Sequence, residues 1–126
     1  MIRHSAGTIL FVATVAAAAL TQATYVRAAT KYDGAWSIVI VTRTGPCDHS
    51  YRFSGQIANG IIFYSGGGPI IFNGRVRSSG AAWVTVSGGS NYAMAHGRLT
   101  VGRGSGSWRG QTSSGYCTGT WSATRA

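Results

Sequence analysis

The segment Ser105–Thr124, SGSWRGQTSSGYCTGTWSAT, contains two Gly-x-Trp triplets on either side of a predicted turn, and a third triplet stands at Gly34–Trp36. In an extended strand the first and third residues of a triplet lie on the same face, so each glycine leaves a flat position beside a large indole ring. We therefore predict that the triplets pack the interior of a small β-barrel or β-sandwich. Their glycines and tryptophans are Gly34, Trp36, Gly106, Trp108, Gly119 and Trp121.

Strand-like composition continues through the rest of the chain. Short runs of β-branched and aromatic residues are separated by turns rich in glycine and serine, among them Asn59-Gly60, a strong hairpin signal. Short connections permit only antiparallel neighbours, and no segment has helical periodicity of useful length. The predicted strands are 34–43, 49–58, 61–65, 70–77, 81–87, 90–101, 105–111 and 116–124.

These strands predict an all-β domain, an eight-stranded antiparallel up-and-down barrel, with a two-sheet β-sandwich as the alternative. Closure of a barrel would place the last strand beside the first. Cys47 follows the first strand and Cys117 begins the last, so the only two cysteines are predicted to form a disulfide. That bond would close a loop of about 70 residues and contribute roughly 4 kcal/mol to stability.

The N-terminus has the three parts of a secretory signal peptide. Arg3 gives a basic start, Ile9–Leu20 is an apolar run shorter than the ~20 residues that span a bilayer, and a small-residue cleavage pattern ends at Ala28. We therefore predict a signal peptide at 1–28 and a single domain at 29–126. The protein is expected in the periplasm or outside the cell, which fits the predicted disulfide.

The residues that would face the interior of the barrel bear on whether it is filled. On the strands 81–87 and 90–101, the alternating residues that would face inward are small, which leaves either a cavity or space for aromatic rings. We expect the tryptophans, Phe53, Phe63 and Phe72 to fill it.

The chain carries a formal net charge of +9, with only two acidic residues and no glutamate. Arginines and aromatic residues recur at alternate positions between 75 and 109, which would place them on one outer face if the other alternates form the core. Such side chains bind phosphates and stack on bases or sugars, although a solvated barrel exterior is the simpler interpretation. The predicted anion-binding residues are Arg75, Arg77, Tyr92, His96, Arg98 and Arg109.

The sequence offers little for catalysis or metal binding. Asp48-His49-Ser50 has the residue types of a hydrolase triad, but adjacent residues of an extended chain point in opposite directions. The histidines His49 and His96 stand in no metal-binding spacing. We therefore predict a protein that is not an enzyme and that has no cofactor and no metal.

The opening Tyr32-Asp33-Gly34-Ala35-Trp36, followed by an apolar strand, resembles the first strand of lipocalin-like, avidin-like and Inh-type protease-inhibitor barrels. Over 29–126, the Asn-Gly hairpin, Gly-Ser-Gly-Ser-Trp and the closing Cys-x-Gly-x-Trp are similar to a family of small exported bacterial proteins. The resemblance implies the fold and the compartment rather than an activity.

Two functions follow as expectations. The first is a non-enzymatic binding protein that engages an anionic polymer, such as lipopolysaccharide, an acidic polysaccharide or nucleic acid, through the arginine-rich face. The alternative is an inhibitor-like or lectin-like module that binds one protein or glycan through loops such as Thr44–Asp48 and Ser65–Pro69. The sequence does not specify an oligomeric state.

Overall fold

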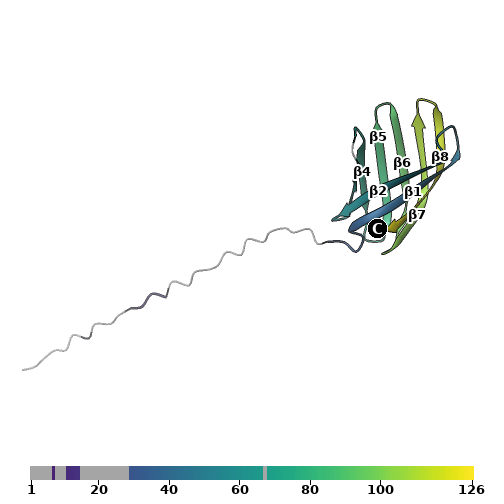
Figure 1. Cartoon of the computed structure of the whole chain (residues 1–126). Coiled ribbons are helices and arrows are strands. Elements are labelled where there is room, and N and C mark those ends of the chain that lie inside the picture. The colour runs from purple at the N-terminus through teal and green to yellow at the C-terminus, as the bar shows by residue number, and fades with distance from the viewer. Residues whose placement is uncertain (1–6, 8–10, 15–28, 67) are drawn as a thin grey trace, which may run out of the picture.

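A computed structural model describes residues 7, 11–14, 29–66 and 68–126 of the chain. Each strand pairs antiparallel with the next, and β1 also pairs with β8, so the sheet closes into a barrel (Figure 1). The predicted barrel is thus confirmed and the sandwich alternative is wrong, because all eight described strands belong to one closed ladder. The strands are β1 (Gly34–Thr44), β2 (Ser50–Ala58), β3 (Ile61–Tyr64), β4 (Ile71–Val76), β5 (Ala81–Gly88), β6 (Asn91–Leu99), β7 (Arg103–Thr112) and β8 (Gly115–Arg125).

The predicted signal peptide, 1–28, lies outside the described residues except for 7 and 11–14. Among the residues that the structure describes, no helix is long and apolar enough to cross a membrane.

Most strand boundaries differ from prediction by one or two residues, and the largest difference is between β6 and β7. The predicted strand 90–101 ends at Leu99, and β7 begins at Arg103 rather than at 105. The Thr100 hydroxyl accepts a hydrogen bond from the Arg103 N–H at 3.2 Å, and the Thr100 N–H donates to the Arg103 carbonyl at 2.7 Å. A threonine that satisfies backbone groups locally favours a turn over continuation of a strand.

The Gly-x-Trp triplets of β7 and β8 interlock across the two strands. Trp108 lies opposite Gly119, and Gly106 lies opposite Trp121. A Cβ atom at Gly119 would lie 2.6 Å from Trp108 Nε1, and one at Gly106 would lie 2.6 Å from Trp121 Nε1. The flat position left by each glycine is therefore occupied by the tryptophan of the neighbouring strand.

Both indoles reach beyond the glycine they cover and hydrogen-bond to the next strand. Trp108 Nε1 donates to the Val41 carbonyl of β1, and Trp121 Nε1 donates to the His96 carbonyl of β6, each at 3.1 Å. Each ring consequently connects three adjacent strands and lies along the inner wall of the barrel.

One end of the barrel is closed by the segment that precedes β1. Tyr32 is 2% exposed, its hydroxyl donates to the Ser78 carbonyl at 3.2 Å, and its own carbonyl accepts the Trp36 Nε1–H at 2.8 Å. The buried core lies here and consists of Tyr32, Trp36, Ile57, Val76, Ala82, Leu99 and Ala123.

Arg125, the last residue of β8, holds this closed end together. Its guanidinium donates to the carbonyls of Lys31 at 2.7 Å, Asp33 at 2.6 Å and Val101 at 2.8 Å. It also lies over the Trp36 ring, 4.8 Å from the centroid. One side chain thus joins the C-terminal strand, the β6–β7 turn and the segment before β1.

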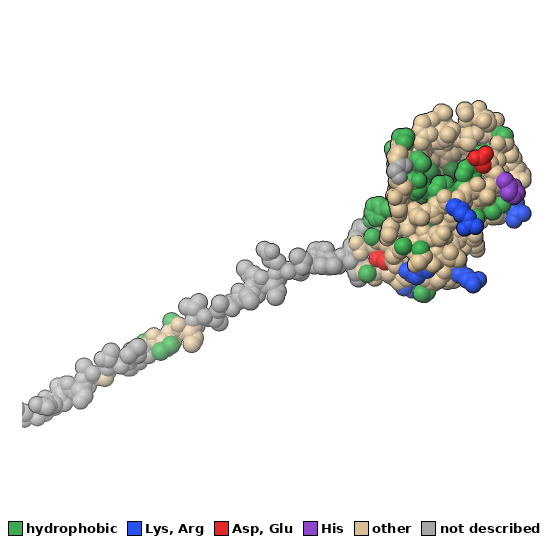
Figure 2. Space-filling view, in the orientation of Figure 1, with side chains coloured by type: hydrophobic (Ala, Val, Ile, Leu, Met, Phe, Trp, Pro, Cys, Tyr) green, Lys and Arg blue, Asp and Glu red, His purple; other side chains and the backbone are tan. Residues whose placement is uncertain are grey.

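The other end of the barrel remains open, and the expectation of a filled interior is wrong. Figure 2 shows this end hollowed, with hydrophobic side chains inside it, and two adjoining chambers lie within. Phe63 does not contribute to filling: it pairs with Gln56 on the outer face and is 49% exposed. Phe53 and Phe72 do line the interior, but the indoles of Trp108 and Trp121 lie along the wall instead of crossing the hollow.

Candidate functional site

The outer surface of β4–β7 carries the residues that were predicted to bind anions. The strand register places Arg75, Trp83 and His96 side by side on β4, β5 and β6, and Ser107 follows on β7. Neighbouring strands are about 4.8 Å apart, so these side chains form a continuous row. A cation, an exposed ring and an imidazole thus alternate across the sheet.

A second row lies beside the first, toward the open end. Met94 and Arg109 pair across β6 and β7, and Arg109 Nη2 lies 3.9 Å from Met94 Sδ. Tyr92 occupies the next outward position of β6 and is 45% exposed. We call this surface the arginine–aromatic face, defined by Arg75, Trp83, Tyr92, Met94, His96, Arg98 and Arg109.

The arginine–aromatic face forms because the residues of the same strands that face inward are small or apolar. Ala82 and Val84 flank Trp83 in β5, and Ala95 and Gly97 flank His96 in β6; the flanking residues are buried or half-buried, whereas Trp83 and His96 between them are exposed. Strict alternation along a half-buried strand fixes this assignment.

Five of the six predicted anion-binding residues belong to the arginine–aromatic face. The sixth, Arg77, lies in the turn after β4, because that strand ends at Val76. Sequence reasoning missed Trp83, which is 39% exposed between Arg75 and His96. The sequence pattern indicates this position, since Trp83 alternates with Ala82 and Val84 in the same way as the predicted anion-binding residues alternate with their small neighbours.

Both acidic residues of the chain lie away from this face. Asp33 is at the closed end, where hydrogen bonds from the Thr30 hydroxyl and from the N–H groups of Asn59 and Gly60 lower the pKa of its carboxyl from 3.8 to about 2, against a smaller opposing effect of desolvation. Asp48 is in the loop between β1 and β2. The arginines of the face therefore have no carboxylate among them.

Asp48, His49 and Ser50 are exposed at the open end, where the loop enters β2. The backbone of Asp48 is engaged: its carbonyl accepts the Thr42 hydroxyl at 2.6 Å, and its N–H donates to the Tyr51 hydroxyl at 3.1 Å. Within the described part of the chain, no three His, Cys, Asp or Glu side chains gather as a metal site would require. The absence of an enzymatic activity stays a prediction.

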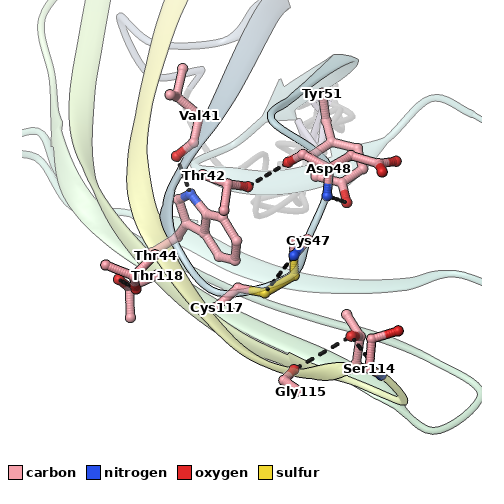
Figure 3. The surroundings of a disulfide bond; sticks show 12 residues. Val41, Thr42, Thr44, Cys47, Asp48, Tyr51, Ser114, Gly115, Cys117 and Thr118 are labelled. Atoms are coloured by element: carbon pink, nitrogen blue, oxygen red, sulfur yellow. Dashed lines mark hydrogen bonds between the residues drawn. A yellow bond between two sulfur atoms is a disulfide. The ribbon is translucent and has the colours of Figure 1, made fainter.

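The loops of the alternative function both lie at the open end. The predicted disulfide is confirmed, with an S–S distance of 2.01 Å between Cys47 and Cys117, and it fastens the Thr44–Asp48 loop to the start of β8 (Figure 3). The Cys47 N–H also donates to Cys117 Sγ at 3.1 Å, and the Thr44 and Thr118 hydroxyls are hydrogen-bonded. The Ser65–Pro69 loop connects β3 and β4 at the same end, and its residue 67 is outside the described part.

Comparison with known proteins finds no matching family model, no matching curated protein and no matching solved structure.

Proposed function

We propose that this chain is a non-enzymatic binding protein that engages an anionic polymer through the arginine–aromatic face. The observation that carries the proposal is the row Arg75, Trp83 and His96, in which a ring stands between two basic groups on adjacent strands. A polymer lying across the strands would meet these groups in succession.

The chemistry of the row suits phosphate, sulfate or carboxylate groups that alternate with rings. Guanidinium groups bind such anions with two parallel hydrogen bonds, and exposed aromatic rings stack on bases or sugars. A formal net charge of +9 would also attract a polyanion from a distance. Lipopolysaccharide, an acidic polysaccharide and single-stranded nucleic acid all present this combination.

The test measures the affinity of the oxidised protein for these three polymers at several salt concentrations. Log affinity should fall linearly with log salt, because binding releases counterions from the polymer. Arg75→Gln/Arg109→Gln should lower the affinity by at least about tenfold and reduce the salt slope. Arg43→Gln/Arg52→Gln removes the same charge from β1 and β2, on a different part of the barrel, and should retain most of the affinity.

Equal losses in the two double variants would mean that net charge, and not this face, attracts the polymer. An affinity indifferent to salt would refute the proposal. Retention of a protein or neutral glycan through high salt, by both variants, would instead favour the loop-based alternative, which the shared position of the two loops at the open end supports.

A further inference from the structure

The interior of the barrel contains two adjoining chambers. The inner chamber, of about 100 Å³, lies above the closed end and is bounded by Trp36, Leu99 and Trp121. The outer chamber, of about 260 Å³, reaches the open end and is bounded by Cys47, Ile70 and Trp108. The side chains shared by both chambers are Ile40, Phe53, Phe72 and Val86.

The walls of the chambers are fixed by specific contacts. On β2, β3 and β4, Phe53 packs edge-on against Tyr64 at 6.0 Å, and Tyr64 stacks on Phe72 at 5.2 Å between ring centroids. The indoles of Trp108 and Trp121 are held along the wall by their hydrogen bonds to backbone carbonyls. These rings cannot turn into the hollow without losing a hydrogen bond, so the space is maintained by the fold.

Among the described residues, tyrosine phenols are the only ionisable groups that line the chambers, although the chain is strongly basic. The inner chamber is bounded almost wholly by aliphatic and aromatic side chains. The neutral hydrogen-bonding side chains of Asn91 and Thr112 line the outer chamber. A charged group brought inside would lose its hydration without a partner, whereas a neutral head could hydrogen-bond in the outer chamber.

The arrangement favours a flexible chain over a rigid ring system. Apolar cavities of about 150 Å³ in protein cores stay dry and take up small hydrocarbons. Here the ligand must also pass between Ile40, Phe53, Phe72 and Val86 to occupy both chambers. An alkyl chain can thread this junction, while its head remains in the outer chamber.

We propose that the barrel interior binds one uncharged amphiphile, an alkyl chain with a neutral hydrogen-bonding head such as a hydroxyl, inserted chain first from the open end. This site lies inside the barrel and shares only Trp83 and Tyr92 with the arginine–aromatic face, and binding to it does not depend on the proposed function.

The test uses protein recovered after expression of the whole chain under oxidising conditions, and 1-alkanols from hexanol to dodecanol as probes. Binding is followed by intrinsic tryptophan fluorescence, since Trp36, Trp108 and Trp121 line the chambers, and by isothermal titration calorimetry. We expect saturable binding of one alkanol per chain, unaffected by salt, with carboxylates and amines of the same chain length at least about tenfold weaker. Independence from salt distinguishes this site from polymer binding on the outer face.

A matched pair of variants locates the site. Val86→Phe places a ring at the junction of the chambers and should weaken binding of the longer alkanols at least about tenfold, because the inner chamber is then blocked. Ser87→Phe adds the same ring to the next residue of β5, on the outer face, and should bind like the wild type. Should Val86→Phe fail to fold, Ala95→Val narrows the inner chamber with two methyl groups and should shorten the longest alkanol that binds.

Three results would overturn the proposal. One is the absence of saturable binding for every alkanol. Another is equal binding to Val86→Phe and Ser87→Phe when both are folded. The third is binding of carboxylates or of rigid aromatic compounds as tight as, or tighter than, binding of alkanols, since either would assign the interior to a different class of ligand.

Discussion

Trp108 and Trp121 show how glycine is used in this barrel. A glycine in a strand weakens the strand by itself, because it has no side chain to pack. Here the absence of Cβ at Gly106 and Gly119 lets an indole lie directly on the neighbouring strand and hydrogen-bond to the strand beyond. Each tryptophan can therefore lie against the neighbouring strand only because the residue opposite it is glycine.

We predict that Gly106→Ala and Gly119→Ala each lower the free energy of unfolding by about 1–3 kcal/mol, because the new methyl group would clash with the backbone carbonyl of His96 or Val41 and would displace an indole. Alanine at Gly102 would meet no atom within 4 Å, so Gly102→Ala serves as the control and should change stability little. Urea unfolding of the three oxidised variants measures the difference. If all three resemble the wild type, both the indoles and the facing backbone can move away at no cost.

At the scale of elements, the β2–β3 hairpin is fastened to the segment that precedes β1. Asn59 and Gly60 both have positive φ, 53° and 76°, as a tight two-residue hairpin turn requires. Their N–H groups point to the Asp33 carboxylate, at 2.8 Å from Asn59 and 3.2 Å from Gly60. One carboxylate thus orders the turn and attaches the N-terminal segment to the closed end.

This attachment should depend on pH. Since folding lowers the pKa of Asp33 from 3.8 to about 2, the folded chain binds fewer protons than the unfolded chain between these values. The stability contributed by Asp33 is therefore complete above about pH 4 and is lost as the pH falls toward 2. Unfolding measured between pH 5 and about pH 2 should show this loss in the wild type, and a smaller loss in Asp33→Asn.

The variant Thr30→Val removes the strongest of the hydrogen bonds that lower the pKa of Asp33, and should move its titration, followed by NMR, to higher pH. An identical acid dependence in wild type and Asp33→Asn would contradict this account.

For the whole molecule, the two ends of the barrel are stabilised by different means. The closed end has a buried core and the hydrogen bonds of Arg125, whereas the open end surrounds a hollow. The Cys47–Cys117 disulfide lies at the open end and joins residues separated by 70 positions. The disulfide therefore joins β8 to the β1–β2 loop at the end of the barrel that surrounds the hollow.

We predict that Cys47→Ala/Cys117→Ala is less stable than the oxidised wild type by roughly 4 kcal/mol, because the unfolded chain regains the freedom of a long loop. Guanidinium unfolding of both proteins tests this. Reduced wild type should match the double variant. A double variant as stable as the oxidised protein would show that the β1–β8 ladder closes the barrel unaided.

Much of the fold and of the outer face could be predicted from local features. Alternation with period two placed Arg75, His96 and Arg109 opposite a core of small residues, and turn residues such as Asn59-Gly60 set the hairpins. Trp83 follows the same alternation, so the same local pattern also places it on the outer face. The two cysteines indicated which strands meet when the sheet closes.

The sequence by itself determined which residues form strands, which of their faces is apolar and which cysteines pair, because each depends on neighbouring residues or on a single possible pairing. Only the tertiary structure decided that Trp108 covers Gly119, that Arg125 reaches Lys31 from 94 positions away, and that the interior stays partly empty. These features depend on how far the strands shift past one another when the barrel closes, which sets the neighbour each side chain meets. Local periodicity determines which side of the sheet a side chain faces, whereas closure of the barrel determines which residues it contacts.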